Sequence, residues 1–249
     1  MTSFLVCLLL TIQPGLSDTV DEIIESARDA QKVDRSIQRI RMTLVSRSGA
    51  ERVREFEVRV RQDGDVISSY TRFSQPRDVA GTQMVMVDHP ESTDVQMLYL
   101  PAFQTVRTIA GNARRGAFMG SDFAYEDLEI SNPSDSNPQL VSETDALWII
   151  DTEPSDDSSY SRIRLHVDKS NYLPVRIEFF DQRGDALKVL EVLEQTMSGE
   201  TVLPTRSRMT NLQRGSSTLL EIVDHQLNVS EDEIPLSIFT QRYMEQNGQ

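Results

Sequence analysis

Residues 118–128 read Phe-Met-Gly-Ser-Asp-Phe-Ala-Tyr-Glu-Asp-Leu, and the segment Tyr-Leu-Pro-Ala-Phe-Gln-Thr-Val-Arg at 99–107 precedes them closely. The first segment carries four large apolar side chains in a turn-rich connection, namely Phe118, Met119, Phe123 and Tyr125. Connections usually run over the surface and are mostly polar, so this composition indicates a segment that folds back onto an apolar surface.

Working outward, an alternation of apolar and polar residues predicts strands along most of the chain. The alternating apolar positions are Ile40, Met42 and Leu44; Phe56, Val58 and Val60; Met84 and Met86; Met97 and Tyr99; Leu147 and Ile149; Ile163, Leu165 and Val167; Val175, Ile177 and Phe179; and Leu220 and Ile222. Turn residues such as Asp63-Gly64 and Arg183-Gly184 separate these runs. Many strands joined by tight turns predict an antiparallel sheet.

Two helices are expected beside this sheet. Thr19 and Glu22 form a capping-box pair ahead of an apolar stripe at helical spacing, made by Val20, Ile23, Ile24, Ala27 and Ala30. A final short helix is expected within residues 234–243. The predicted fold class is therefore mainly β (α+β), an open and curved antiparallel sheet with a few helices covering its concave face.

The N-terminus has the layout of a secretory signal peptide. An apolar run at residues 4–12 precedes Gly15 and Ser17, the small residues that a signal peptidase reads. The run is shorter than the ~20 apolar residues of a membrane-spanning helix. We expect residues 1–17 to be the signal peptide and 18–249 to form a single domain. The segment before the apolar run carries no Lys or Arg, and a buried N-terminal strand is the alternative.

The formal net charge is −14, from 25 Lys and Arg against 39 Asp and Glu. Nucleic acid is therefore excluded as an expected partner, because phosphate binding needs clustered positive charge. The same charge predicts that an anionic membrane surface repels the molecule at long range. The one cysteine, Cys7, lies within the expected signal peptide, which leaves the mature chain without a thiol or a disulfide.

Catalytic and metal-binding patterns are missing from the sequence. His89, His166 and His225 are isolated from one another and from carboxylates at metal-ligand spacing. Ser121 lacks the strand-turn-helix context of a serine nucleophile, and a cap on a short helical turn at 125–128 is the simpler role for Ser121 or Asp122. We expect no enzyme activity, no metal and no cofactor.

The segments 118–128 and Tyr99-Leu-Pro-Ala resemble the LolA-like outer-membrane lipoprotein-sorting proteins, as do Phe73-Ser-Gln-Pro and Gly81-Thr. The resemblance implies an incomplete β-barrel with helices across its mouth, whose concave face holds lipid acyl chains. It also implies a lid held by an arginine that hydrogen-bonds to backbone. Arg39, Arg41 and Arg107 are the candidates for that arginine.

The resulting hypothesis is a periplasmic carrier or chaperone for lipid or lipoprotein acyl chains, taking part in outer-membrane lipoprotein sorting. Methionine suits a surface that accepts differently shaped apolar ligands. The expected cavity and lid residues are Met84, Met86, Met97, Tyr99, Phe118, Met119, Phe123 and Tyr125. The alternative is a non-catalytic accessory or sensor module that docks to an inner-membrane exporter or envelope complex. The partners expected besides the acyl chains are an inner-membrane exporter or an outer-membrane acceptor. A hydrolase is a third possibility.

Overall fold

The computed structural model describes residues 18–89, 94–129, 137–199 and 201–248, so the expected signal peptide lies outside the described residues. One antiparallel sheet of thirteen strands has the order β6-β5-β4-β3-β2-β1-β13-β12-β11-β10-β9-β8-β7. The strands are β1 (Arg35–Val45), β2 (Glu51–Asp63), β3 (Val66–Gln75), β4 (Gln83–Asp88), β5 (Val95–Leu100), β6 (Thr105–Thr108), β7 (Gln139–Glu143), β8 (Leu147–Thr152), β9 (Tyr160–Asp168), β10 (Pro174–Asp181), β11 (Ala186–Ser198), β12 (Thr201–Asn211) and β13 (Ser216–Leu227).

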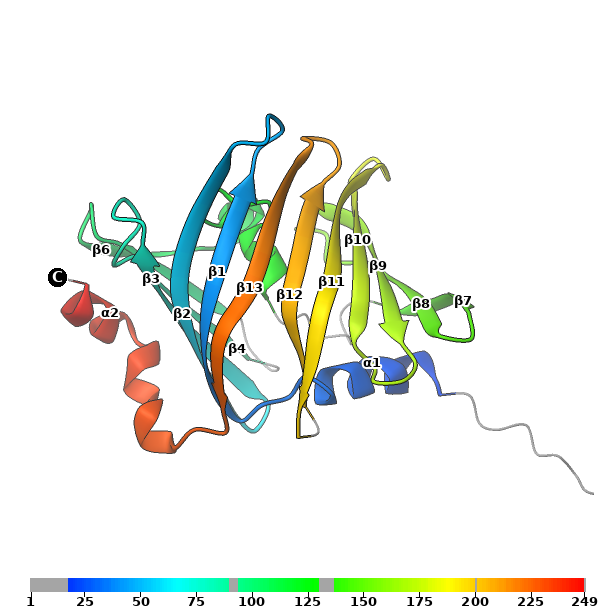
Figure 1. Ribbon diagram of the computed structural model, residues 1–249, viewed down its shortest axis with the longest axis horizontal. Coiled ribbons are helices and arrows are strands. Elements are labelled where there is room, and N and C mark those ends of the chain that lie inside the picture. The colour runs from blue at the N-terminus through cyan, green and yellow to red at the C-terminus, as the bar shows by residue number, and fades with distance from the viewer. Residues whose placement is uncertain (1–17, 90–93, 130–136, 200, 249) are drawn as a thin grey trace, which may run out of the picture.

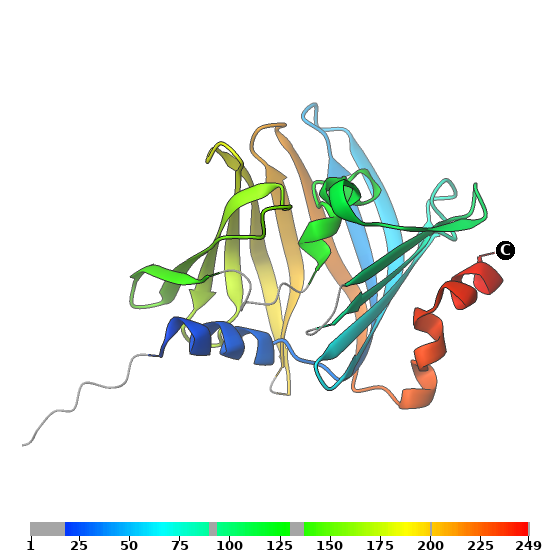
Figure 2. The same cartoon turned by 180° about the vertical axis from the view of Figure 1, so that it is seen from behind.

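The sheet is strongly curved and does not close, since β6 and β7 remain its two edges (Figures 1 and 2). Register shifts between Arg39 and Ile40 in β1 and between Val192 and Glu194 in β11 accompany the curvature, because an extra residue in one strand bends it. The expectation of a mainly β, curved and open antiparallel sheet is confirmed.

Strand alternation separates a concave apolar face from a convex charged face. In β1, Met42 and Leu44 are buried in the main core. Arg41 points to the opposite face, where it pairs with Glu55 of β2 at 3.0 Å. The predicted turn at Asp63-Gly64 joins β2 to β3, and Gly64 has a φ of 62°, a conformation that glycine adopts without steric cost.

Helix α1 (Val20–Asp29) covers one end of the concave face, as Figure 2 shows. The predicted capping box between Thr19 and Glu22 is present. Ile23, Ile24 and Ala27 pack against Ile150 of β8 and Val167 of β9. The predicted amphipathic helix on a sheet is thus confirmed.

The C-terminal elements lie on the convex face, contrary to the expectation that the helices cover the concave face. The 3₁₀ turn η6 (Leu236–Phe239) and helix α2 (Gln241–Asn247) follow β13 around the outside of the sheet (Figure 1). Ile238 and Met244 pack there against Tyr70, Val85 and Tyr99. The reason is that β3, β4 and β5 carry large apolar residues on both faces, so their convex side also needs cover.

The final helix begins later than the sequence pattern suggested, at Gln241 instead of within the apolar run that starts at Ile234. Thr240 caps it, accepting a hydrogen bond from the Tyr243 N–H at 3.2 Å. Among the described residues, no helix combines the length and apolar content needed to span a membrane.

Candidate functional site

The candidate site is the segment 118–128, which crosses the concave face of the sheet (Figure 2). It contains two 3₁₀ turns, η2 (Phe118–Gly120) and η3 (Tyr125–Leu128). Phe118, Phe123 and Tyr125 are buried in the main core, and the Phe118 ring lies 5.9 Å from the Phe73 ring of β3. The segment therefore folds onto an apolar surface, as its composition indicated.

The first turn of this segment closes on itself. The Phe118 N–H donates to the Phe123 carbonyl at 2.7 Å, and the Ser121 hydroxyl donates to the Phe118 carbonyl at 2.7 Å. Met119 and Gly120 between them have φ values of 49° and 70°. A positive φ at a methionine costs about 1–3 kcal/mol and persists only where surrounding contacts hold it.

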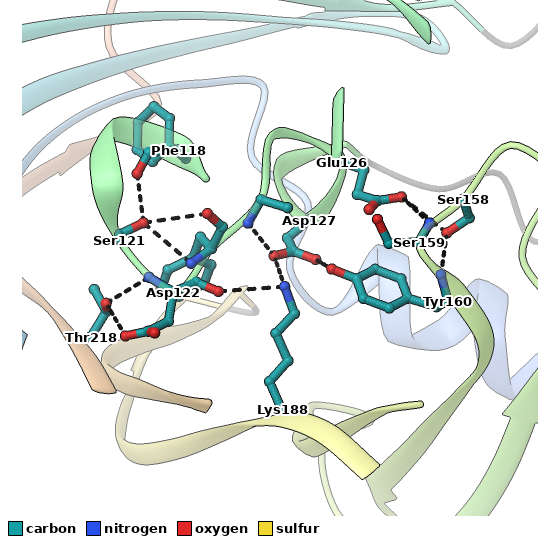
Figure 3. Close-up of polar contacts among 12 residues, drawn as sticks. Phe118, Ser121, Asp122, Glu126, Asp127, Ser158, Ser159, Tyr160, Lys188 and Thr218 are labelled. Carbon is teal, nitrogen blue, oxygen red and sulfur yellow. Dashed lines mark hydrogen bonds and ion pairs between the residues drawn. The ribbon is translucent and has the colours of Figure 1, made fainter. Parts of the chain in front are cut away.

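Two polar anchors fix the segment to the sheet (Figure 3). At the first, the Asp122 carboxylate accepts hydrogen bonds from the hydroxyls of Thr218 at 2.8 Å and Ser216 at 2.5 Å. Both hydroxyls belong to β13, in the middle of the sheet. This anchor ties the centre of the segment to the beginning of β13, a central strand of the sheet.

The second anchor is a buried ion pair between Lys188 of β11 and Asp127 of η3, whose side chains are 5% and 2% exposed. The Asp127 carboxylate also accepts hydrogen bonds from the Tyr160 hydroxyl at 2.7 Å and the Ala124 N–H at 2.6 Å. Asp127 therefore caps η3, not Ser121 or Asp122. Burial, and Asp127 beside it, raise the pKa of Tyr160, which keeps the phenol protonated as a donor.

The aromatic surroundings of Lys188 complete this anchor. Its ammonium lies 5.0 Å from the Tyr160 ring centroid and 5.1 Å from that of Phe179. The buried ion pair between Lys188 and Asp127 adds little net stability compared with two apolar side chains of similar size. Removing one partner, however, costs about 3–5 kcal/mol because the other charge stays buried. The pair thus specifies where the segment sits on the sheet.

A third set of contacts links the end of the segment to neighbouring loops. Glu126 accepts hydrogen bonds from the Ser158 hydroxyl at 3.0 Å and the Ser159 N–H at 3.1 Å. Glu129, just beyond the segment, pairs with Arg114 of η1 (Gly111–Arg115). The segment is therefore held at its C-terminal end as well as in the middle.

An arginine does hydrogen-bond to the backbone of this segment, but it is Arg54 of β2, which donates to the Met119 carbonyl. The three candidates from the sequence lie elsewhere. Arg39 pairs with Asp224, Arg41 pairs with Glu55, and the Arg107 guanidinium stacks over the Phe103 ring at 5.1 Å. The contact with Arg54 also explains how Met119 holds its positive φ.

Six of the eight predicted cavity and lid residues come together on the concave face. They are Met84, Met86, Phe118, Met119, Phe123 and Tyr125. The other two, Met97 and Tyr99, pack on the convex face under the C-terminal elements. Side chains alternate between the two faces of a strand, so Met97 and Tyr99 of β5 point outward, whereas Gln96 and Leu98 point inward. The ligand-binding role of the six remains a prediction.

Two cavities adjoin the segment. An apolar cavity of about 200 Å³ lies below Leu128 and is lined by Val60, Ile67, Met86 and Val95, with Asp88, Asp94 and Gln96 among its polar groups. A polar cavity of about 190 Å³ is lined by Asp122, Lys188, Arg115 and Arg214. Both are smaller than the ~300–1,000 Å³ typical of small-molecule sites. The concave face is thus largely filled by the protein's own side chains.

The apolar cavity contains a pair of interacting carboxyl groups. Burial, together with the nearby Asp94 carboxylate, raises the pKa of Asp88 to about 6. The Gln96 side chain is 2% exposed and donates to Glu129. Its carbonyl oxygen has no hydrogen-bond partner among the described residues.

Ser121 is engaged by its own segment, and the described residues show no cluster that could bind a metal. The Ser121 hydroxyl is engaged with the Phe118 carbonyl and accepts the Phe123 N–H at 3.2 Å. His166 lies on the strand β9, 3.7 Å from Glu178, and burial lowers its pKa. Among the described residues, no group of three or more His, Cys, Asp or Glu side chains could hold a metal ion.

Sequence reasoning missed Arg54, Lys188 and Tyr160, which together fix the segment. Lys188 did carry a signal, since it occupies an inward position of a strand in the run Leu187-Lys188-Val189-Leu190. A lysine there needs a buried partner. That partner, Asp127, is 61 residues away in sequence, so the pairing depends on the fold.

Comparisons with known proteins agree with this architecture. A family model described as an uncharacterized protein matches residues 66–246. A search of curated proteins found no match. Among solved structures, a domain described as an outer membrane lipoprotein-sorting protein from Vibrio parahaemolyticus has a TM-score of 0.84 and 27% identity, over 90% of this chain and 97% of that one.

Two further structures share the fold at lower identity. A DUF1329 family protein from Desulfovibrio piger has a TM-score of 0.80 and 23% identity, over 90% of this chain and 100% of that one. A LolA superfamily protein from Nitrosomonas europaea has a TM-score of 0.71 and 20% identity, over 91% of this chain and 100% of that one. The chain therefore belongs to the family of the matching model, and its fold is the LolA-like half-barrel.

Proposed function

We propose that this protein is a periplasmic carrier that shelters the acyl chains of a lipid or lipoprotein on the concave face of its half-barrel, without catalysis. The observation that carries the proposal is the apolar cavity below Leu128, on a face where Met86, Ile177 and Leu190 stay only partly buried. The similarity to a lipoprotein-sorting domain from Vibrio parahaemolyticus supports the same role and a periplasmic location.

The physical need for such a carrier is large. Each methylene moved from water to an apolar surface gains about 0.8 kcal/mol, so a sixteen-carbon chain gains on the order of 12 kcal/mol. A cavity of about 200 Å³ is too small for a chain of that length. Binding therefore requires the segment 118–128 to move, and the chain then replaces Phe118 and Phe123 on the sheet.

The segment is built for such an exchange. Its anchors are hydrogen bonds of Asp122 and Asp127 to the sheet and the Arg54 contact to Met119. Water can satisfy the carboxylates of Asp122 and Asp127 once the segment lifts, and the incoming chain covers the apolar side chains that the segment leaves. Gly116 lies just before the segment, after η1, and Gly120 lies within its first turn, and the backbone can rotate at both.

The experiment is native mass spectrometry of protein purified from the bacterial periplasm, with extraction of any bound lipid. We expect bound acyl-chain mass, reduced at least fivefold in the double variant Met86→Gln, Leu128→Gln, which places polar groups in the apolar cavity. Phe118 and Phe123 are unsuitable targets because both lie in the core. Met197→Gln is the matched control, since Met197 is 57% exposed.

A second candidate is a non-catalytic docking module of an envelope complex. The dense filling of the concave face by Phe118, Phe123 and Tyr125 favours it, because a docking module has no need of an empty groove. If the purified protein carries no acyl-chain mass and stays empty when incubated with lipoprotein or phospholipid, the docking module replaces the carrier as the proposed function.

A further inference from the structure

The apolar cavity below Leu128 has an excess of negative charge in its wall. Three carboxylates line it, those of Asp88, Asp94 and Glu129, and its described wall contains no Lys, Arg or His. Glu129 is balanced from outside the cavity, because Arg114 of η1 pairs with it. Asp88 and Asp94 are therefore the two carboxylates whose charge the cavity wall leaves unbalanced.

These two aspartates disturb one another. Burial, together with the Asp94 carboxylate, raises the pKa of Asp88 to about 6, whereas the charge of Arg28 in α1 lowers it. Like charges at one site repel each other, and a cation beside both replaces this repulsion by attraction. Asp94 is exposed and Asp88 is half-buried, so a cation that arrives from solvent can reach them.

A buried amide in the same wall points to the same kind of ligand. Gln96 of β5 points inward and lines the cavity, and it is 2% exposed. Its amide nitrogen donates to Glu129, but its carbonyl oxygen has no hydrogen-bond partner among the described residues. A buried acceptor without a donor destabilises the fold, so this oxygen favours a ligand that donates a hydrogen bond.

The remaining wall is apolar and suits a short alkyl chain. Val60, Ile67, Met86 and Leu128 supply it, and the cavity measures about 200 Å³. An apolar cavity of roughly 150 Å³ accepts a molecule of the size of benzene. The cavity therefore has room for about six carbons while the segment 118–128 stays in place.

We propose that this cavity binds an amphiphile whose primary ammonium lies within a few bonds of its alkyl chain. The ammonium donates to the carboxylates of Asp88 and Asp94 and to the Gln96 carbonyl oxygen, and the first carbons lie below Leu128. An ammonium has three N–H donors and no acceptor, so it matches these three acceptors. The net charge of −14 attracts such a cation and repels a headgroup that carries phosphate.

This proposal deepens the carrier role and rests on it, because it names the chemical class of the cargo. Two sources share that chemistry. One is a single-chain amine lipid, and the other is a lipidated peptide whose N-terminal amine is free. In both, a primary ammonium lies close to the alkyl chains, as the spacing between the acceptors and the apolar wall requires.

The first test is isothermal titration calorimetry of the full chain with hexylammonium at pH 7.5. Hexyltrimethylammonium has the same charge but no N–H donor, and hexanoate has the opposite charge. We expect hexylammonium to bind, hexyltrimethylammonium to bind about tenfold more weakly because its hydrogen bonds are lost, and hexanoate not to bind. Equal binding of the two ammonium ions would show attraction to net charge alone and would overturn the proposal.

Two variants place the ammonium in the cavity. Asp88→Asn and Asp94→Asn should each weaken hexylammonium binding about tenfold, since each removes one charge-assisted hydrogen bond. Asp145→Asn is the matched control, because Asp145 is exposed in the turn between β7 and β8 and the variant loses the same charge. It should bind hexylammonium as the unaltered protein does. Unchanged binding by both cavity variants would overturn the proposal.

The second test distinguishes the two sources and separates this proposal from the carrier role. Native mass spectrometry compares sphinganine with a dipalmitoylated lipopeptide whose N-terminal amine is free or acetylated. We expect binding of an amine-bearing ligand and loss of lipopeptide binding on acetylation. Periplasmic protein loaded with acyl chains that lack a free amine would overturn this proposal and leave the carrier role. Hexylammonium binding without any long-chain ligand would overturn the carrier role and leave the assignment of the cavity.

Discussion

At the scale of single residues, Asp88 shows how a buried carboxyl group makes stability depend on pH. Asp88 lies at the end of β4 and lines the apolar cavity with Asp94 and Glu129. Burial and these two carboxylates raise the pKa of Asp88, whereas the charge of Arg28 in α1 lowers it. The net result is a pKa of about 6, raised from an ordinary value of 3.8. The charged form is therefore disfavoured in the folded protein relative to the unfolded chain.

We expect Asp88→Asn to stabilise the protein above pH 6 and to have no such effect below about pH 4. Above pH 6 the Asp88 carboxylate of the unaltered protein is charged in both the folded and the unfolded state and destabilises the fold. Below pH 4 the same group is protonated in both states. The gain should be on the order of 1 kcal/mol, because Asp88 is partly exposed and solvent screens its charge. Urea unfolding at pH 4, 5, 6 and 7.5 measures it, and a gain that is equal at all four values would contradict this account.

At the scale of elements, the segment 118–128 shows what sequence could and could not reveal. Its apolar composition correctly predicted that it folds onto an apolar surface, because apolar side chains in a connection need cover. Its anchors were not predictable, since Lys188 and Arg54 reach it from strands 61 and 65 residues away. The sequence did not show that Met97 and Tyr99 point away from the concave face, because β5 is apolar on both faces.

Lys188→Met tests the buried anchor of this segment. We expect the free energy of unfolding to fall by about 3–5 kcal/mol, because Asp127 is left buried and charged without its partner. The double variant Lys188→Met, Asp127→Asn should recover much of this loss, since no unpaired charge remains. Urea unfolding of the two single variants and the double variant forms the cycle; additive losses would show that the two side chains do not interact.

At the scale of the whole molecule, the strands and α1 followed from sequence because burial on one face imposes a period of two or 3.6 residues. The placement of η6 and α2 did not, because an amphipathic segment fits either face of a sheet that is apolar on both sides. The sequence also could not show whether the concave face is empty or filled. That depends on how far the segment 118–128 enters it.

Locking the segment to the sheet tests whether the carrier role requires its movement. Asp122 and Thr218 contact each other through their side chains at 2.8 Å, and the pair Asp122→Cys, Thr218→Cys should form a disulfide there. We expect the oxidised variant to lose acyl-chain binding at least tenfold and to regain it on reduction. Each single cysteine variant is the control, and full binding by the oxidised protein would show that the segment need not move.

The unpaired edges at β6 and β7 give this architecture a freedom that a sealed cylinder lacks. In a closed barrel, strand number and stagger fix the diameter, so widening it must break ladder hydrogen bonds. Here the two edge strands can move apart or together while the hydrogen bonds that join β1 to β2 and β13 stay intact. The sheet can thus widen or narrow, and the number of strands does not fix the width of a ligand that its concave face can hold.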